Sequence, residues 1–306
     1  MKCKLQKFIS ILSVTIALSF CMSLLTAPSW ADTLAAEELS AKSFFRQGIE
    51  AFQSESYESA VENFGQALEQ NAEFAAAYSN RCLAQIYLGN YIDAVTDCDR
   101  ALSLNPSDTE TYLNRGLANH RAKQYVEAIA DFSQLLQIKP HDYRAYYNRG
   151  LAQTELSAYR EAIVDYGEAL RQASPLNRVA QAEIYTDRGL AQLFLENQRE
   201  AIADFSQAIE FSPDLRSYYN RGCAYHQQGN SVAALSDFSQ ALQRDPSNGQ
   251  AYLSRGLIRH EMGELQAAIA DLQQAADCFC HQGLLLAYQQ TLNLLQKIQP
   301  VEMAIG

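Results

Sequence analysis

The chain has 306 residues, of which 48% are hydrophobic and 19% charged, and its net charge at pH 7 is −11. This composition can fill a core and excludes an intrinsically disordered chain. Residues 1–31 hold three lysines and no acid, so their removal would change the charge from −11 to −14. Such an acidic surface repels phosphate backbones, and we expect no nucleic-acid partner.

The first 31 residues differ in pattern from the rest. Three lysines precede an uncharged apolar run from Phe8 to Leu25, and small residues stand at Ser29 and Ala31. This order predicts a secretory signal peptide at 1–31. The alternative is an uncleaved anchor that associates the protein with a membrane, because the apolar run is about as long as the shortest membrane spans. Either reading predicts export, to the periplasm, the cell envelope or the thylakoid lumen.

From residue 41 the sequence repeats. Units beginning at residues 41, 75, 109, 143, 182, 215 and 249 share an aromatic residue at position 4, at spacings of 34, 34, 34, 39, 33 and 34 residues. Position 8 is Gly except at Cys82, position 20 is Ala, and position 24 is large except at Cys98. The aromatic residues of position 4 are Phe44, Tyr78, Tyr112, Tyr146, Tyr185, Tyr218 and Tyr252.

Apolar residues within each unit follow helical spacing. We predict a first helix near positions 1 to 14 and a second near 15 to 28, with Gly89-Asn90 or Gly229-Asn230 at the turn. Small residues at positions 8 and 20 let the helices approach closely, beside the large residue at position 24. One such hairpin cannot bury both faces, so the hairpins must stack.

These columns resemble those of tetratricopeptide repeat (TPR) proteins. The resemblance implies an all-α fold, a right-handed α-solenoid of seven TPR helical hairpins with a C-terminal capping helix. The repeats would span 41–74, 75–108, 109–142, 143–181, 182–214, 215–248 and 249–282, after a short lead at 32–40 and before a capping helix and tail at 283–306. The fourth unit carries about five extra residues around 173–181, which we expect to lengthen a loop or bend the superhelix.

Position 7 is Arg and position 23 is Asp in six units, whereas the first unit has Gln47 and Asn63. Because both positions change together, we predict that they touch in a forked ion pair between the two helices. The alternative is that the arginines bind a ligand. The arginines are Arg81, Arg115, Arg149, Arg188, Arg221 and Arg255, and the acids are Asp97, Asp131, Asp165, Asp204, Asp237 and Asp271.

The TPR resemblance implies that position 6 faces the concave groove of the superhelix. An Asn there offers a donor and an acceptor to any peptide backbone, and apolar side chains at positions 5 and 9 form a floor. The alternative is that these amides only cap or solvate the hairpins. The predicted groove residues are Asn80, Asn114, Asn148, Asp187, Asn220, Tyr147, Tyr219, Leu117 and Leu151.

The cysteines and histidines support narrower hypotheses. The resemblance implies that Cys82 and Cys98 face each other, either as a disulfide in an oxidising compartment or as two buried thiols. Position 12 is His in three units, and His226 and His260 with Cys223 form a weak candidate for a shared metal. We favour ordinary groove-lining histidines, and expect neither a metal nor a cofactor.

No catalytic constellation stands out, so we expect a protein that is not an enzyme. The expected function is an exported scaffold or assembly protein that binds a protein or peptide ligand in its concave groove. The alternative is an accessory or regulatory subunit of an envelope or photosynthetic-membrane complex, docked through its convex face or C-terminal helix. No feature of the sequence fixes the oligomeric state.

Overall fold

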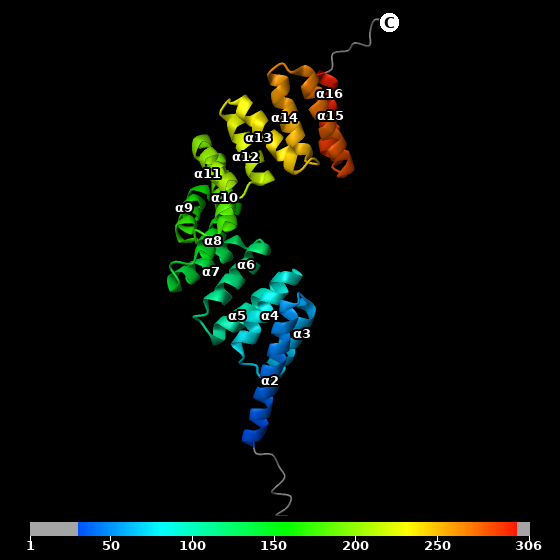
Figure 1. The fold of residues 1–306 in the computed structure, drawn as a ribbon. Coiled ribbons are helices and arrows are strands. Elements are labelled where there is room, and N and C mark those ends of the chain that lie inside the picture. The colour runs from blue at the N-terminus through cyan, green and yellow to red at the C-terminus, as the bar shows by residue number, and fades with distance from the viewer. Residues whose placement is uncertain (1–29, 299–306) are drawn as a thin grey trace, which may run out of the picture. The chain divides into compact units, whose positions relative to one another are not determined.

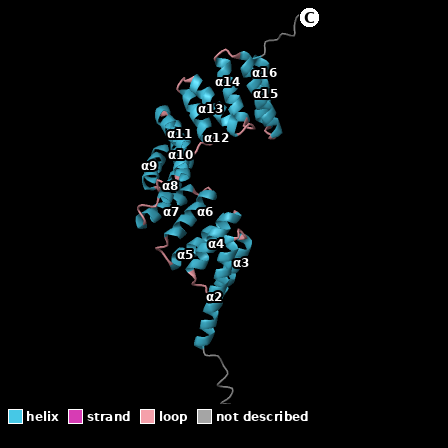
Figure 2. Cartoon of the chain, in the orientation of Figure 1, coloured by secondary structure: helices cyan, strands magenta, loops and turns pink. Residues whose placement is uncertain are grey.

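The structure is a computed structural model that describes residues 30–298, and it places them in helices and loops without a strand in that range (Figures 1 and 2). The all-α prediction is confirmed. The predicted signal peptide lies outside the described residues except for its last two. The helices are α2 (Trp30–Gln53), α3 (Tyr57–Gln70), α4 (Ala75–Leu88), α5 (Tyr91–Leu104), α6 (Thr109–Arg121), α7 (Tyr125–Ile138), α8 (Tyr143–Glu155), α9 (Tyr159–Gln172), α10 (Arg178–Phe194), α11 (Gln198–Phe211), α12 (Leu215–Gln227), α13 (Ser231–Arg244), α14 (Gly249–Glu261), α15 (Leu265–His281) and α16 (Leu285–Ile298).

The helices pack in chain order within two compact units, whose described parts are residues 30–118 and 119–298. In the first unit, α2 packs on α3, α3 on α4 and α4 on α5. In the second, contacts between successive helices run from α7 to α16. Contacts mainly between helices adjacent in sequence, with a few between alternate helices such as α8, α10 and α12, are the packing expected of stacked hairpins. Among the described helices, none is both long and apolar enough to span a membrane.

The columns of small and aromatic residues form the core. The ring at position 24 lies directly on the glycine at position 8: a Cβ added to Gly150 would stand 2.7 Å from the ring of Tyr166, and one on Gly189 would stand 2.8 Å from that of Phe205. Both rings are fully buried. The glycine is therefore required because the ring occupies the space of a side chain.

The second helix begins at position 17 of each unit rather than at the predicted position 15, and it ends at position 30 rather than 28 in six units and at position 33 in the seventh. The reason lies at position 15, which is left-handed in all seven units and so ends the first helix. Gly89, Gly229 and Gly263 have φ of 81° to 83° there, whereas the four remaining units place Glu55, Lys123, Ser157 and Glu196 at φ of 60° to 62°.

We expect glycine to relieve this backbone strain. A left-handed conformation costs a non-glycine residue about 1–2 kcal/mol, partly offset by the greater freedom of glycine in the unfolded chain. Glu196→Gly should therefore raise the free energy of unfolding by about 0.5–1 kcal/mol, and Gly229→Ala, the matched reverse change, should lower it. Urea unfolding of both variants checks this, and two shifts of the same sign would refute it.

The extra residues of the fourth unit extend a helix as well as a loop. The loop after α9 covers 173–177, and α10 then begins at Arg178, four residues before the start of the fifth unit. Asn177 caps this added turn, because its Oδ1 accepts a hydrogen bond from the Ala180 amide at 3.2 Å. The expectation that the insertion lengthens a loop or bends the superhelix did not include this added helical turn.

The predicted C-terminal helix is present as α16, and it packs on α15. Thr291 and Leu295 are buried, while Gln289, Asn293 and Gln296 are exposed. A helix with one buried and one polar face can close a stack of hairpins. Its first turn is different, because Leu284, Leu285 and Leu286 are 49%, 73% and 74% exposed.

Candidate functional site

The arginines at position 7 of five units form the ion pair predicted from the sequence. In the third unit, Arg115 pairs with Asp99, and Asp131 accepts a hydrogen bond from Asn119. In the fourth unit, Arg149 Nε and Nη2 each lie 2.7 Å from an oxygen of Asp165, which is 3% exposed. The hydrogen bond to Asp165 raises the pKa of Arg149. The same fork joins Arg81 to Asp97, Arg188 to Asp204, Arg221 to Asp237 and Arg255 to Asp271, with N···O distances of 2.6 to 2.9 Å.

Each arginine has two further neighbours. The tyrosine three residues earlier, at position 4, places its ring centroid 5.6 Å from the Arg149 guanidinium carbon, and the same cation–π contact is present in six units at 5.4 to 5.7 Å. Nη1 of Arg149 donates to Ser133 of the preceding hairpin at 3.1 Å. The guanidinium is thus held within the stack, which favours the structural interpretation over ligand binding.

The contact between each arginine and the preceding hairpin was not predicted. The residue types at position 25 could have indicated it. That position is Ser133, Ser206 or Ser239 where a hydroxyl accepts from the next arginine at 3.0 to 3.1 Å. It is Asp99 in the second unit, whose Oδ1 lies 2.5 Å from Nη1 of Arg115. Where it is glycine, as at Gly65, an added Cβ would stand 3.5 Å from the Arg81 guanidinium.

The first compact unit holds three of the predicted groove residues. Asn80 on α4 is half-buried, and its Nδ2 donates to the Ala76 carbonyl at 2.8 Å. Asn114 on α6 is 9% exposed and has no hydrogen-bond partner among the described residues. Leu117, one turn further along α6, is half-buried. All three lie on first helices of hairpins, as predicted.

The second compact unit holds the other six predicted groove residues. The carboxylate of one of them, Asp187, already has partners on neighbouring helices. Asp187 on α10 is 7% exposed, accepts from the Tyr147 hydroxyl of α8 at 2.7 Å and pairs with Nη2 of Arg216 of α12 at 2.5 Å. Burial and the carboxylate of Asp187 raise the pKa of Tyr147. This network ties three successive first helices together, so Asp187 and the Tyr147 hydroxyl are already occupied.

Four groove residues remain around that network. Asn148 donates through Nδ2 to the Arg144 carbonyl at 2.7 Å, which leaves its Oδ1 without a partner among the described residues. Asn220 has no hydrogen-bond partner in the described part of the chain. Tyr219 shares a hydrogen bond with Ser254 at 3.4 Å, and burial raises its pKa. Leu151 packs against the core of the fourth hairpin.

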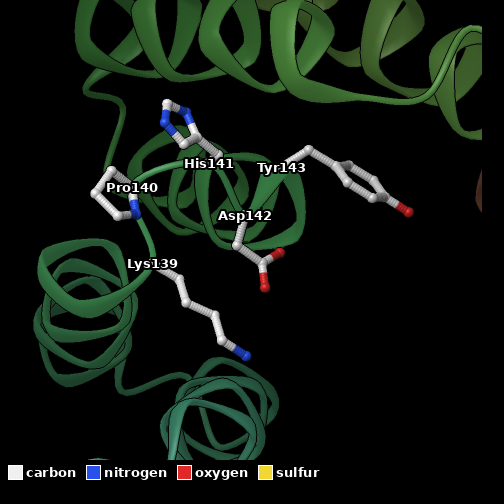
Figure 3. Close-up of a pocket in the computed structure, with 5 residues that line it drawn as sticks. All are labelled: Lys139, Pro140, His141, Asp142 and Tyr143. Atoms are coloured by element: carbon white, nitrogen blue, oxygen red, sulfur yellow. The ribbon is translucent and has the colours of Figure 1, made fainter.

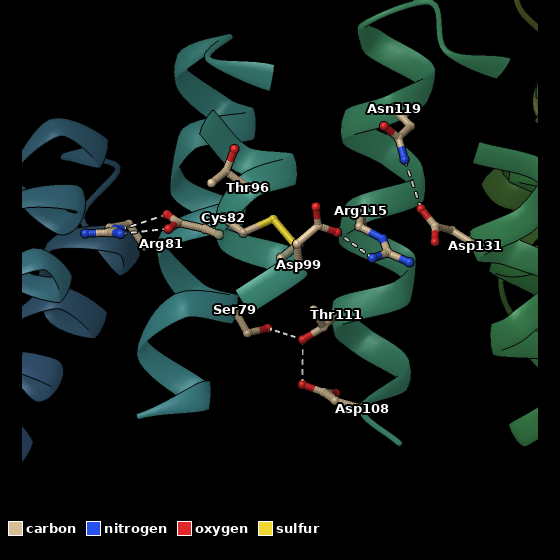
Figure 4. The surroundings of a disulfide bond; sticks show 12 residues. Ser79, Arg81, Cys82, Thr96, Asp99, Asp108, Thr111, Arg115, Asn119 and Asp131 are labelled. Atoms are coloured by element: carbon tan, nitrogen blue, oxygen red, sulfur yellow. Dashed lines mark hydrogen bonds and ion pairs between the residues drawn. A yellow bond between two sulfur atoms is a disulfide. The ribbon is translucent and has the colours of Figure 1, made fainter. Parts of the chain in front are cut away.

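Cys82 on α4 and Cys98 on α5 form a disulfide, which settles the open alternative (Figure 4). Both are fully buried, and their Cα atoms are 5.6 Å apart. They stand at positions 8 and 24, where other units place the glycine and the ring. The disulfide therefore fills the space that the ring takes elsewhere.

At the other candidate sites, the described side chains do not converge on a common point where a ligand could bind. Around residues 139–143 lies a hollow of about 390 Å³, whose labelled side chains point in different directions (Figure 3). In the described part of the chain no group of three or more His, Cys, Asp or Glu side chains is placed to hold a metal ion. His226 lies 3.9 Å from Glu261 instead.

Stacked two-helix hairpins with the same ion pair, ring and glycine in successive units define an α-helical repeat protein. The chain belongs to the tetratricopeptide repeat family, whose sequence profiles match residues 75–108, 109–142, 136–178, 182–215, 216–248 and 249–277. A comparison with curated proteins gave no match.

Several solved structures share the fold. A tetratricopeptide repeat protein from Parabacteroides merdae ATCC 43184 is 20% identical, with a TM-score of 0.62 over 83% of this chain and 99% of that one. PilW, described as a type IV pilus biogenesis factor, is 18% identical, with a TM-score of 0.59 over 67% and 94% of the two chains. YrrB, a TPR protein, is 21% identical, with a TM-score of 0.52 over 63% and 97%. Identities this low show the fold alone.

Proposed function

We propose that this protein is an exported, non-enzymatic scaffold or assembly protein that binds an extended protein segment along the first helices of its hairpins. The observation that carries the proposal is the contrast between positions 6 and 7. The arginines are occupied within the stack, whereas Asn114 and Asn220 have amide groups without partners among the described residues. Such amides can pair with a peptide backbone whatever its side chains.

Because the carboxylate of Asp187 already has partners, it is not among the groups that we propose to bind a ligand. In the second compact unit, the amides of Asn148 and Asn220 would hold the bound segment, while the rings of Tyr147 and Tyr219 and the side chain of Leu151 supply apolar contacts. Asp187 would act by fixing the spacing of α8, α10 and α12. YrrB is described as having an unusual peptide-binding site, which supports peptide recognition on this fold.

The disulfide supports the proposed export. Disulfides persist in oxidising compartments and are rare in the cytosol. Cys82 and Cys98 form one inside a hairpin core, and the predicted signal peptide would deliver the chain to such a compartment. PilW, a fold relative, is described as a pilus biogenesis factor, which agrees with a role in assembly at the cell envelope. The periplasm, the envelope and the thylakoid lumen all meet this requirement.

A crosslinking pull-down from envelope extract tests the groove. The triple variant Asn114, Asn148 and Asn220→Ala should bind any captured partner at least tenfold more weakly, because each lost hydrogen bond is worth about 1 kcal/mol. The matched control replaces three exposed glutamines on second helices, Gln134, Gln207 and Gln273, by Ala. Circular dichroism and thermal unfolding establish that both variants fold.

Equal capture by the two triple variants would overturn the groove proposal. It would favour the second candidate, an accessory or regulatory subunit that docks through other surfaces. Exposed apolar residues favour that candidate: Val164 on α9 is 64% exposed, Val232 on α13 is 70% exposed and Leu285 on α16 is 73% exposed. Isolated apolar residues are common on protein surfaces, so we place this function second.

A further inference from the structure

The last helix contributes to a hollow of its own. A cavity of about 390 Å³ is lined by Leu253 of α14 and by Gln290, Thr291, Asn293, Leu294 and Lys297 of α16. Leu253 is position 5 of the seventh unit, the column that holds Tyr147 and Tyr219 in earlier units. The hollow therefore continues the line of the proposed groove beyond the last hairpin.

The polar lining of this hollow includes the ammonium of Lys297 and the carboxamides of Gln290 and Asn293, all of which can donate hydrogen bonds. Gln290, Asn293 and Lys297 follow one another at i, i+3 and i+7, so they share one face of α16. Asn293 Oδ1 accepts from Gln289 Nε2 at 3.3 Å, which leaves its Nδ2 as a donor for a ligand. Lys297 is the one charged residue of the lining, and it forms no ion pair within residues 30–298.

The apolar lining lies beside these donors. Leu253 and Leu294 are both half-buried and face the hollow from two different helices. An ammonium and a carboxamide donor next to aliphatic side chains complement a carboxylate that stands beside an aliphatic group.

We propose that the hollow between α14 and α16 binds a partner protein's extended segment in which an acidic side chain stands beside an aliphatic one. Lys297 and Asn293 receive the carboxylate, and Leu253 and Leu294 receive the aliphatic side chain. The helix α16 is then a binding element as well as a cap. The inference rests on the proposed function, since the segment would continue along the same first helices. The preference for an acidic side chain, in contrast, depends on α16 alone.

The test uses two sets of immobilised, C-terminally amidated decapeptides. One set permutes Asp and Glu with Leu, Ile and Val, and the other replaces every acid by its amide. The full-length protein, purified from the envelope after expression with its own residues 1–31, should bind the best acidic peptides about tenfold better than their amide counterparts, the effect of one charged hydrogen bond. Lys297→Met should remove that preference, and the control Lys123→Met, at an exposed turn, should retain it.

The outcomes separate this inference from the groove proposal. Acid preference that is lost in Lys297→Met but kept in the triple asparagine variant supports the α16 site, and overall binding that the asparagine variant leaves unchanged counts against the asparagine groove. Equal binding of both peptide sets, lost in the asparagine variant, supports the groove and overturns the α16 site. No binding to either set overturns both. Binding that appears only after removal of residues 299–306 would show that the chain's own tail fills the hollow, which also overturns a partner segment there.

Discussion

Arg149→Ala will lower the free energy of unfolding by about 3 kcal/mol, because it leaves the buried carboxylate of Asp165 without its partner. Asp165 is 3% exposed and receives both hydrogen bonds of the fork from this one side chain. The guanidinium also touches the Tyr146 ring and Ser133, so neighbouring hairpins lose contacts as well. Urea unfolding followed by circular dichroism measures the change.

Two further variants separate the ion pair from general damage. The double variant Arg149→Met with Asp165→Leu should lose less stability than Arg149→Ala, because no charge is then left buried. Arg171→Ala serves as the control, since Arg171 is 67% exposed and pairs with Glu168 at the surface, where an ion pair contributes at most about 1 kcal/mol. If Arg149→Ala and Arg171→Ala had equal effects, the position 7 arginines would not hold the stack together.

Reduction of the disulfide between Cys82 and Cys98 will lower stability by about 3 kcal/mol, the value expected for a closed loop of this length. The two cysteines are 16 residues apart and join α4 to α5. Because both are fully buried, the loss should appear in equilibrium unfolding with a reductant present, together with faster amide exchange in α4 and α5. Cys223→Ser, which leaves the disulfide intact, is the control.

The core geometry of the other hairpins suggests a double variant that should restore the stability lost with the disulfide. The double variant Cys82→Gly with Cys98→Phe would give the second unit the glycine and ring that Gly189 and Phe205 form in the fifth. We expect this variant to recover most of the stability lost on reduction and to be insensitive to reductant. A double variant no more stable than the reduced protein would show that the disulfide does not replace the ring.

The parts of the structure that depend on the repeat were predictable from the sequence. Seven copies act as an internal alignment, so the joint change of positions 7 and 23 in the first unit revealed the ion pair between them. The columns of glycine and large residues likewise indicated the core, because a ring needs space that a glycine leaves. Features that recur in most units leave such a signal, and the helical hairpins follow from them.

Features of a single unit were harder to predict. Asp187 looked like one more groove residue, but its partner Arg216 stands at a position whose residue type varies between units, so no column revealed the contact. The start of each second helix was missed by two residues because the left-handed residue at position 15 is glycine in only three units. The disulfide remained open because residue types alone do not distinguish two buried thiols from a bond.

The central claim is that a partner segment lies against the first helices of the hairpins, and site-specific photocrosslinking tests it most directly. A photoreactive residue would replace Leu151 on α8 in one variant and Val164, 64% exposed on α9, in another, each expressed in the envelope of the source cells. The account predicts a partner adduct from the α8 position that disappears when Asn148 and Asn220 are also changed to Ala. Adducts formed from the α9 position alone, unaffected by those two changes, would contradict it.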